Sequence, residues 1–241
     1  MKGIILAGGK GSRLYPLTKV TNKHLLPIGK EPMLFHSIKQ MVQASIDEIL
    51  VVTSTDHMGD VVRCIGSGDD FNCNITYRVQ QNASGIADAL SLAEPFAGGD
   101  KICVMLGDNI FQKSIAPYVD TFTKQEAGAR VLLKKVSDPY RFGIAALDEK
   151  QIIEIEEKPA SPKSSFAVVG LYFFDSKVFE FIKQINPSEN GELEITNVNN
   201  KYIDLGQLEY DVYQGKWTDA GTFDSYFEAN KLMMEAENEI V

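Results

Sequence analysis

Hydrophobic residues in the first half of the chain gather in short runs, and the stretches between these runs have apolar positions at helical spacing. We expect buried strands at four runs, residues 4–7, 49–53, 75–79 and 102–106. We expect helices between them, over residues 33–44, 59–65 and 87–92. Strands that alternate with helices are typical of βαβ units and of a mostly parallel sheet. The first half therefore predicts an α/β fold.

After residue 130 the pattern becomes strand-rich. Apolar runs predict strands over residues 131–136, 142–146, 152–156 and 167–174. Helical spacing returns over residues 176–185, 196–205 and 223–237. We interpret the chain as a Rossmann-like, mostly parallel mixed sheet flanked by helices, with a strand-rich lobe that covers the sheet edge and recognises another ligand.

A glycine-rich turn, residues 8–13 (GGKGSR), follows the first strand. Glycines let backbone N–H groups approach a ligand closely, and the guanidinium of Arg13 suits phosphate oxygens. Lys23 adds a second cation ten residues later. The turn is neither a Walker loop nor a dinucleotide fingerprint, since Leu14 stands where the last glycine of that fingerprint belongs. The order predicts a polyphosphate site of another class, and a tight turn without a ligand is the alternative.

Polar residues follow two other predicted strands. Gln80 and Gln81 come after the third strand, and Gly107, Asp108 and Asn109 come after the fourth. Ligands of open α/β sheets bind at the carboxyl ends of the strands. We therefore expect these side chains to share one edge of the sheet with the glycine turn.

Two separated aspartates are candidate metal ligands. Asp108 follows a buried strand, and Asp219 lies in the segment WTDAGT, between an aromatic residue and a small turn. Mg²⁺ is commonly held by one or two carboxylates together with substrate phosphates. The alternative is that each aspartate shapes a turn, and composition alone leaves this open for Asp219.

The segment 155–159 (IEEKP) puts two acids and a lysine at a strand end. These side chains could bind sugar hydroxyls and a phosphate, or they could form a solvated charge run. Thr196 is equally ambiguous, because it could cap the helix that follows it. The three histidines form no triad pattern with a serine or cysteine, so the sequence gives no support for nucleophilic catalysis.

Composition narrows the class of protein. The 241 residues carry a formal net charge of −9, which argues against a general nucleic-acid binder. The three cysteines are scattered, without zinc spacing, as expected of buried thiols in a reducing compartment. The first apolar run is too short for a signal peptide, and no stretch reaches membrane-spanning length. We expect a cytoplasmic enzyme whose substrates are small molecules.

In order, these segments resemble the sugar-phosphate nucleotidylyltransferases, and most closely the short form of the glucose-1-phosphate thymidylyltransferases. The resemblance runs from Met1 to about Thr222. The matching segments are GIILAGGKGSRLYPLT, KHLLPIGKEPM, YRVQQNASGIADAL, MLGDNIF, DPYRFGIA, IEEKP, PKSSFAVVGLYFFD, GELEITNVN and WTDAGT. It implies a nucleotide-diphospho-sugar transferase fold and one domain over 1–241, with a nucleotide-binding half (1–128), a sugar-phosphate-binding half (129–222) and a C-terminal helix (223–241).

The resemblance also implies a reaction and its residues. A hexose 1-phosphate, most closely glucose 1-phosphate, would attack dTTP in line to give dTDP-sugar and pyrophosphate, with Mg²⁺ as cofactor. Such a product feeds polysaccharide biosynthesis, as in the dTDP-rhamnose pathway. The implied catalytic residues are Arg13, Lys23 and Lys158, and the implied metal ligands are Asp108 and Asp219. The implied nucleotide-binding residues are Leu6, Gly8, Gly9, Gly11, Ser12, Arg13, Gln80, Gly85 and Asp108. The implied sugar-phosphate-binding residues are Asn109, Tyr140, Gly143, Glu157, Lys158, Val169, Gly170 and Tyr172.

Four positions depart from the family pattern. Ser12 replaces a threonine, Lys10 a small or neutral residue, Asp88 a glutamine and Asn190 an arginine. Exact substrate identity therefore stays open: the alternatives are a uridylyltransferase, a thymidylyltransferase for another hexose, and a nucleotide-sugar sensor without activity. We expect neither nucleic-acid nor membrane partners, and a homo-oligomer is compatible with the family. Because one helical stretch follows Thr222, we expect the second nucleotide site of longer members to be missing.

Overall fold

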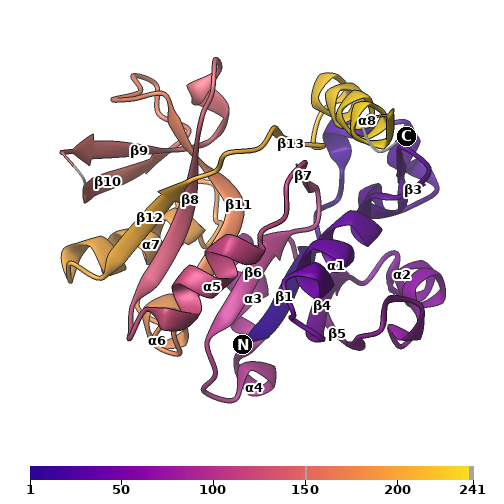
Figure 1. Cartoon of the computed structure of the whole chain (residues 1–241), viewed down its shortest axis with the longest axis horizontal. Coiled ribbons are helices and arrows are strands. Elements are labelled where there is room, and N and C mark those ends of the chain that lie inside the picture. The colour runs from indigo at the N-terminus through magenta and orange to yellow at the C-terminus, as the bar shows by residue number, and fades with distance from the viewer. Residues whose placement is uncertain (150, 239–241) are drawn as a thin grey trace. The chain divides into compact units, whose positions relative to one another are not determined.

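The computed structural model describes residues 1–149 and 151–238, and it divides into two compact units. The first, here called the glycine-turn unit, combines Lys2–Ala83 and Met105–Pro117 with the chain from Gln214 onward. The second, called the central unit, combines Ser84–Val104 with Tyr118–Tyr213. Neither unit is one continuous stretch of chain, and the boundary between them falls within strand β6 (Ile102–Leu106), labelled in Figure 1.

Three parallel strands form the framework of the glycine-turn unit. They are β1 (Lys2–Ala7), β4 (Glu48–Ser54) and β5 (Asn74–Gln80). Val51 of β4 pairs with Ile5 of β1 on one side and with Tyr77 of β5 on the other. Helix α1 (Met33–Gln43) packs against β1, and α2 (Met58–Ile65) packs against β4. These elements confirm the alternating pattern, and each begins within two residues of its expected position.

The parallel pairing brings the ends of β1 and β5 to one edge of the sheet. Thr53 of β4 pairs with Ala7 of β1, and Gln80 pairs with Ser54. A Cβ atom placed on Gly8 would lie 2.9 Å from the Oε1 atom of Gln80. The glycine turn and Gln80 therefore lie against each other, as the sequence predicts.

Two short strands that are far apart in the sequence pair with each other in the glycine-turn unit. Strand β7 (Asn109–Phe111) pairs antiparallel with β13 (Trp217–Asp219), so that Asp219 lies opposite Asn109. Asp219, expected between an aromatic residue and a small turn, is the last residue of β13. Both strands have three residues, too short to show the period-two alternation by which strands are recognised.

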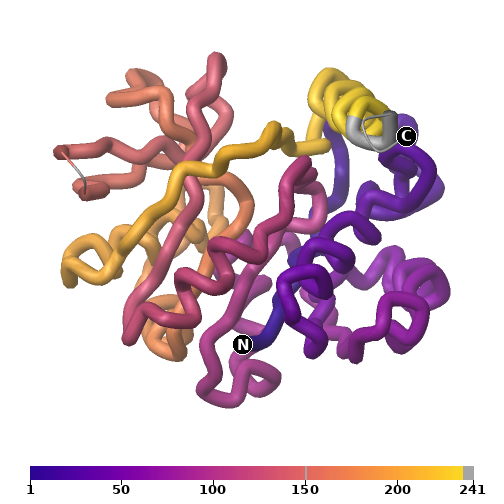
Figure 2. The backbone as a smooth tube through the Cα atoms, viewed as in Figure 1, coloured from indigo at the N-terminus to yellow at the C-terminus, as the bar shows by residue number. Residues whose placement is uncertain are grey.

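The C-terminal helix α8 (Phe223–Asn238) packs on β2 (Pro27–Ile28), which pairs with β3 (Glu31–Pro32). Figure 2 shows the yellow helix beside this indigo segment, and the Tyr226 hydroxyl donates to the Pro27 carbonyl at 2.6 Å. The buried side chains of this cluster are Ile28, Met33, Ile110, Ala220, Ala229 and Leu232. This packing holds the segment that carries Asp219 onto the start of the chain.

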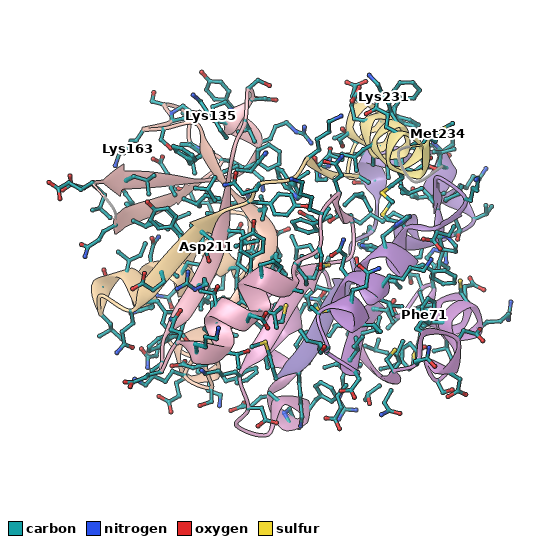
Figure 3. All side chains as sticks on the ribbon, viewed as in Figure 1. Phe71, Lys135, Lys163, Asp211, Lys231 and Met234 are labelled. Carbon is teal, nitrogen blue, oxygen red and sulfur yellow. The ribbon has the colours of Figure 1, made fainter. Side chains whose placement is uncertain are left out.

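The central unit is strand-rich, as expected. Its strands are β8 (Ala129–Lys135), β9 (Gly143–Asp148), β10 (Gln151–Glu157), β11 (Phe166–Phe174) and β12 (Leu208–Val212). Within the unit they are ordered β10, β9, β11, β8, β12, and β12 alone pairs in parallel. Strand β12 was not predicted from the sequence pattern. Asp211 of β12, labelled in Figure 3, accepts a hydrogen bond from Arg130 of β8 at 2.7 Å.

Short helices complete the central unit. They are α3 (Ile86–Ser91), α4 (Glu94–Ala97), α5 (Ala116–Lys124, whose first two residues belong to the glycine-turn unit), α6 (Val178–Ile182) and α7 (Ile195–Asp204). Helices α4 and α5 were not predicted from the sequence pattern, and α6 is shorter than the predicted helix over residues 176–185. Pro187 disfavours a helical conformation at Asn186 and so limits how far a helix could extend, but α6 already ends at Ile182.

The helices and the cysteines of the described residues can be compared with the expectations drawn from composition. Among the residues that the structure describes, no helix combines the length and the apolar content needed to cross a membrane. The three cysteines are free thiols. Cys73 and Cys103 are buried as expected, whereas Cys64 is only partly buried.

Candidate functional site

The glycine turn runs into a short 3-10 helix, η1 (Ser12–Leu14), which leaves Ser12 and Arg13 exposed. A Cβ atom on Gly9 would lie 3.4 Å from the Lys23 ammonium, and Gly11 packs against the Lys23 stem. The predicted phosphate-binding residues Gly8, Gly9 and Gly11 therefore lie next to Lys23 or Gln80. Leu6, also predicted to bind nucleotide, is a buried residue of β1.

Asp108 carries an ion pair with the predicted catalytic lysine. The Lys23 ammonium lies 2.5 Å from the Oδ2 atom of Asp108, and both side chains are mostly buried. Burial raises the pKa of the Asp108 carboxyl, but the charge of Lys23 and hydrogen bonds from Lys23 and Asn109 outweigh it and hold the pKa well below its usual range. Asp108 is therefore an anion at neutral pH.

A second carboxylate and a guanidinium meet the Asp108 carboxylate at Gly221. A Cβ atom on Gly221 would lie 2.9 Å from Oδ2 of Asp219, 3.1 Å from an Arg13 nitrogen and 3.7 Å from Oδ2 of Asp108. Both predicted metal ligands thus point an oxygen at the same point. The backbone fixes this arrangement, because the Ala220 N–H donates to the Asp108 carbonyl at 2.7 Å.

The two carboxylates near Gly221 fit a hard divalent cation whose remaining ligands come from substrate and water. Among residues 1–149 and 151–238, no group of three or more His, Cys, Asp or Glu side chains could hold a metal. Two carboxylates are what Mg²⁺ uses when phosphates and water supply its other ligands. Asp108 and Asp219 therefore suit a cation delivered with a polyphosphate.

Trp217 and Asn109 extend the contacts of Asp108. The Trp217 indole N–H donates to the Asn109 side-chain oxygen at 2.8 Å. The Asn109 amide nitrogen donates in turn to Oδ1 of Asp108 at 2.9 Å. The family resemblance implies a sugar-phosphate role for Asn109, and no sequence pattern indicates a role for Trp217. Trp217 and Asp219 lie on one face of β13, but a three-residue strand is too short for its sequence to reveal this.

His24 lies next to this ion pair and was not singled out from the sequence. Its ring nitrogen Nδ1 lies 2.7 Å from the Asn22 side-chain oxygen, so Nδ1 carries the proton. Burial first, and the Lys23 charge second, lower the pKa of His24 from 6.5 to about 3, against an opposing effect of Asp108. A neutral imidazole is therefore packed beneath the charged pair.

We expect this neutral histidine to make folding sensitive to acid. Between pH 6.5 and about 3 the unfolded chain binds a proton that the native His24 refuses. The stabilisation is therefore complete above pH 6.5 and is lost as the pH falls toward 3. His24→Asn keeps the donor to Asn22 and removes the titration. Urea unfolding across this range should show a slope of free energy against pH that is lower in the variant by about 1.4 kcal/mol per pH unit; equal slopes would contradict the assignment.

A second group of predicted residues meets in the central unit. The Thr196 hydroxyl donates to one oxygen of Glu157 at 2.7 Å, and the Lys158 ammonium lies 3.1 Å from the other. A Cβ atom on Gly143 would lie 3.2 Å from Glu157 and 3.4 Å from Thr196. Thr196 does not cap α7, whose N-cap is Glu194. Thr196 thus holds the Glu157 carboxylate close to Gly143, whereas the neighbouring Lys158 is exposed, as expected of a solvated charge run.

The backbone and a neighbouring acid add to this cluster. Lys158 adopts a left-handed conformation, with φ 42°, and its N–H donates to the Phe142 carbonyl at 3.0 Å. Non-glycine residues in this conformation are concentrated at functional sites. Burial and the Glu157 charge raise the pKa of Glu194. A group that supplies positive charge or hydroxyl donors would relieve the crowding of these acids.

The remaining predicted residues of the central unit are more dispersed. Val169 and Gly170 are buried in β11, where its register with β8 shifts between Val168 and Tyr172, and Tyr172 stacks on Phe174. Tyr140 is exposed in the 3-10 helix η5 (Pro139–Arg141). Gly85, predicted to read the base together with Gln80, packs against the backbone of Leu193. Gln80 and Gly85 belong to different units.

Comparison with known proteins agrees with this geometry. The sequence matches the model of a family described as nucleotidyl transferase over residues 2–236. It is 41% identical over 243 residues to a glucose-1-phosphate thymidylyltransferase of Neisseria meningitidis, a match that covers 99% of this chain and 84% of that protein. The enzyme of the same name from Mycolicibacterium smegmatis is 36% identical, with 98% and 83% covered.

Solved structures give the same result. A Bacillus anthracis protein, provisionally assigned as a glucose-1-phosphate thymidylyltransferase and crystallised with sucrose, is 57% identical and superposes with a TM-score of 0.93. The superposition covers 96% of this chain and 94% of that one. A UDP-glucose pyrophosphorylase in complex with UDP-glucose is 22% identical with a TM-score of 0.85, covers 97% and 98%, and shares the fold.

Proposed function

Because the chain belongs to the nucleotidyl transferase family, we propose that it joins glucose 1-phosphate to dTTP and releases dTDP-glucose and pyrophosphate. The observation that carries the proposal is the convergence of Asp108, Asp219 and Arg13 at Gly221, next to the glycine turn. Relatives that match nearly the whole chain and bear the name glucose-1-phosphate thymidylyltransferase support the choice of substrates.

The reaction needs a nucleophile from the substrate and charge neutralisation from the protein. An oxygen of the sugar phosphate attacks the α-phosphorus of dTTP in line, and the bond from that phosphorus to the bridging oxygen of the β-phosphate breaks. Both electrons of that bond leave with pyrophosphate. Backbone N–H groups of the glycine turn and the cations Arg13 and Lys23 bind the triphosphate. When Mg²⁺ is held by Asp108 and Asp219, it supplies further positive charge to the phosphates.

The central unit offers groups of the kind that a hexose 1-phosphate needs. Glu157, with its carboxylate held by Thr196, accepts hydrogen bonds from sugar hydroxyls, and Lys158 binds the phosphate. A side chain at Gly143 would crowd both Glu157 and Thr196, so the glycine lets these two side chains lie close to the strand. Positioning and electrostatics, with no covalent protein intermediate, account for the chemistry.

Base and sugar selectivity are the points at which alternatives differ. Gln80 could pair with uracil as well as with thymine, and a methyl contact is worth only about 1 kcal/mol. A panel of dTTP, UTP, CTP and ATP against several hexose 1-phosphates, read by pyrophosphate release, tests the proposal. We expect the highest kcat/KM for dTTP with glucose 1-phosphate. A higher value for UTP would favour a uridylyltransferase, and no turnover with tight nucleotide-sugar binding would favour a sensor.

The hydrogen bond from Thr196 to Glu157 gives a prediction for the sugar side. Thr196→Val keeps the shape and removes the hydroxyl, so the Glu157 carboxylate loses a donor worth about 1.5–3 kcal/mol. We expect KM for glucose 1-phosphate to rise about tenfold or more, with KM for dTTP nearly unchanged. Thr196→Ser restores the hydroxyl and should restore KM. Equal changes in both KM values would show that the residue is only structural.

A further inference from the structure

Trp217 lies two hydrogen bonds away from the carboxylate that would hold the metal. We propose that Trp217 is a positioning residue: acting through Asn109, it binds one oxygen of Asp108 into the protein and directs the other oxygen, Oδ2, toward cations. The inference rests on the proposed function, because it concerns the metal which that function uses. It adds a role for the only tryptophan of the chain.

The direction of each hydrogen bond follows from the donors. An indole N–H can only donate, so the atom of the Asn109 amide that faces it at 2.8 Å must be the oxygen. The amide nitrogen therefore faces Oδ1 of Asp108, at 2.9 Å. Without the indole donor, the amide could turn over and present its oxygen to the carboxylate, which would repel it. Trp217 thus fixes which end of Asn109 meets Asp108.

The β7–β13 pairing keeps the three residues in register. Trp217 pairs with Phe111, and Asp219 pairs with Asn109, so Trp217 reaches the Asn109 side chain along the diagonal of the two strands. Asn109 is buried, with 4% of its surface exposed, which limits replacement of a lost hydrogen bond by water. The same strand that carries the indole thus also carries the second metal ligand.

The two carboxylate oxygens of Asp108 therefore have different partners. Oδ1 accepts from Asn109, whereas Oδ2 meets the Lys23 ammonium at 2.5 Å and faces the point at Gly221 that Oδ2 of Asp219 also approaches. A carboxylate held in one rotation presents the same oxygen to every cation. Partners of this kind typically change metal affinity 10- to 100-fold when they are removed.

The experiment measures Mn²⁺ alone, binding to the full chain without substrates, by the loss of the free Mn²⁺ signal in electron paramagnetic resonance. Trp217→Phe keeps an aromatic ring and removes the donor, and we expect it to weaken Mn²⁺ binding about tenfold. Asn109→Ala should weaken it to a similar degree. Because both act through one chain of hydrogen bonds, the double variant should bind no more weakly than Asn109→Ala. Phe111→Leu, which disturbs the packing of the same strands, should bind as the wild type does.

Unchanged Mn²⁺ affinity in Trp217→Phe, or full additivity in the double variant, would overturn the inference. If Trp217→Phe fails to fold, as judged by urea unfolding, Trp217→Met removes the same donor while keeping a long apolar side chain. Asp108→Asn separates this result from the proposed function. If the wild type and Asp108→Asn bind Mn²⁺ equally, the metal assignment of the proposed function fails, and the inference falls with it. If only the wild type binds, a null result for Trp217→Phe refutes the inference alone.

Discussion

Asp108→Asn should lower turnover by on the order of 100-fold or more while leaving the protein folded. Asparagine has the shape of aspartate but lacks the charge that pairs with Lys23 and that faces Asp219 and Arg13 at Gly221. A loss of turnover in this variant is therefore due to the missing charge and not to a change of side-chain shape. The measurement is kcat at saturating dTTP and glucose 1-phosphate across a magnesium titration, with urea unfolding of each variant.

The matched control for this prediction is Asp120→Asn, which removes a carboxylate from the exposed surface of α5. We expect it to have the turnover of the wild type. Asp219→Asn should follow Asp108→Asn, because its Oδ2 atom approaches the same point. Wild-type kcat in either variant, at every magnesium concentration, would reduce that aspartate to a structural residue of the turn.

Gly85→Ala should destabilise the fold by on the order of 3 kcal/mol. Gly85 has φ 105°, a conformation that strains any residue with a side chain, and an added Cβ atom would lie 2.4 Å from the Leu193 carbonyl oxygen. Two hydrogen bonds hold that backbone in place: Leu193 N–H donates to Ser84 at 2.8 Å, and Ala87 N–H donates to Leu193 at 3.0 Å. The methyl group cannot be accommodated without breaking them.

Gly191→Ala separates the two contributions. Gly191 also has a positive φ, 77°, but no atom of the described residues lies within 4 Å of an added Cβ. We expect it to cost only about 1 kcal/mol, the strain of the left-handed backbone alone. Urea unfolding of both variants measures the difference. Equal destabilisation would show that the contact with Leu193 contributes nothing.

The parallel strands could be predicted because their signals are local. Residues 4–7 and 49–53 are uninterrupted apolar runs, and such runs in parallel strands are buried on both faces. The glycine turn and Gln80 could be placed at one edge because connected parallel strands share a direction. The same reasoning could not find β7 and β13, whose three-residue lengths carry no periodicity.

The contacts within the site depended on long-range pairing. Nothing near Asp108 in the sequence indicates Trp217, since 108 residues separate Asn109 from that indole. Thr196 looked like a helix cap because its local sequence fits one, and its bond to Glu157 spans 39 residues. Sequence patterns thus indicated which residue types carry chemistry, whereas the orientation of each side chain came from pairings made only in the folded chain.

The most direct test of the account is to follow one labelled oxygen through the reaction. Glucose 1-phosphate, with ¹⁸O in the non-bridging oxygens of its phosphate, is incubated with dTTP and Mg²⁺, and the products are read by ³¹P NMR. Direct attack predicts dTDP-glucose and pyrophosphate in equal amounts, with the label entirely in the nucleotide-sugar and partly in its bridging oxygen. Formation of dTMP without dTDP-glucose, or label in the pyrophosphate, would contradict the account.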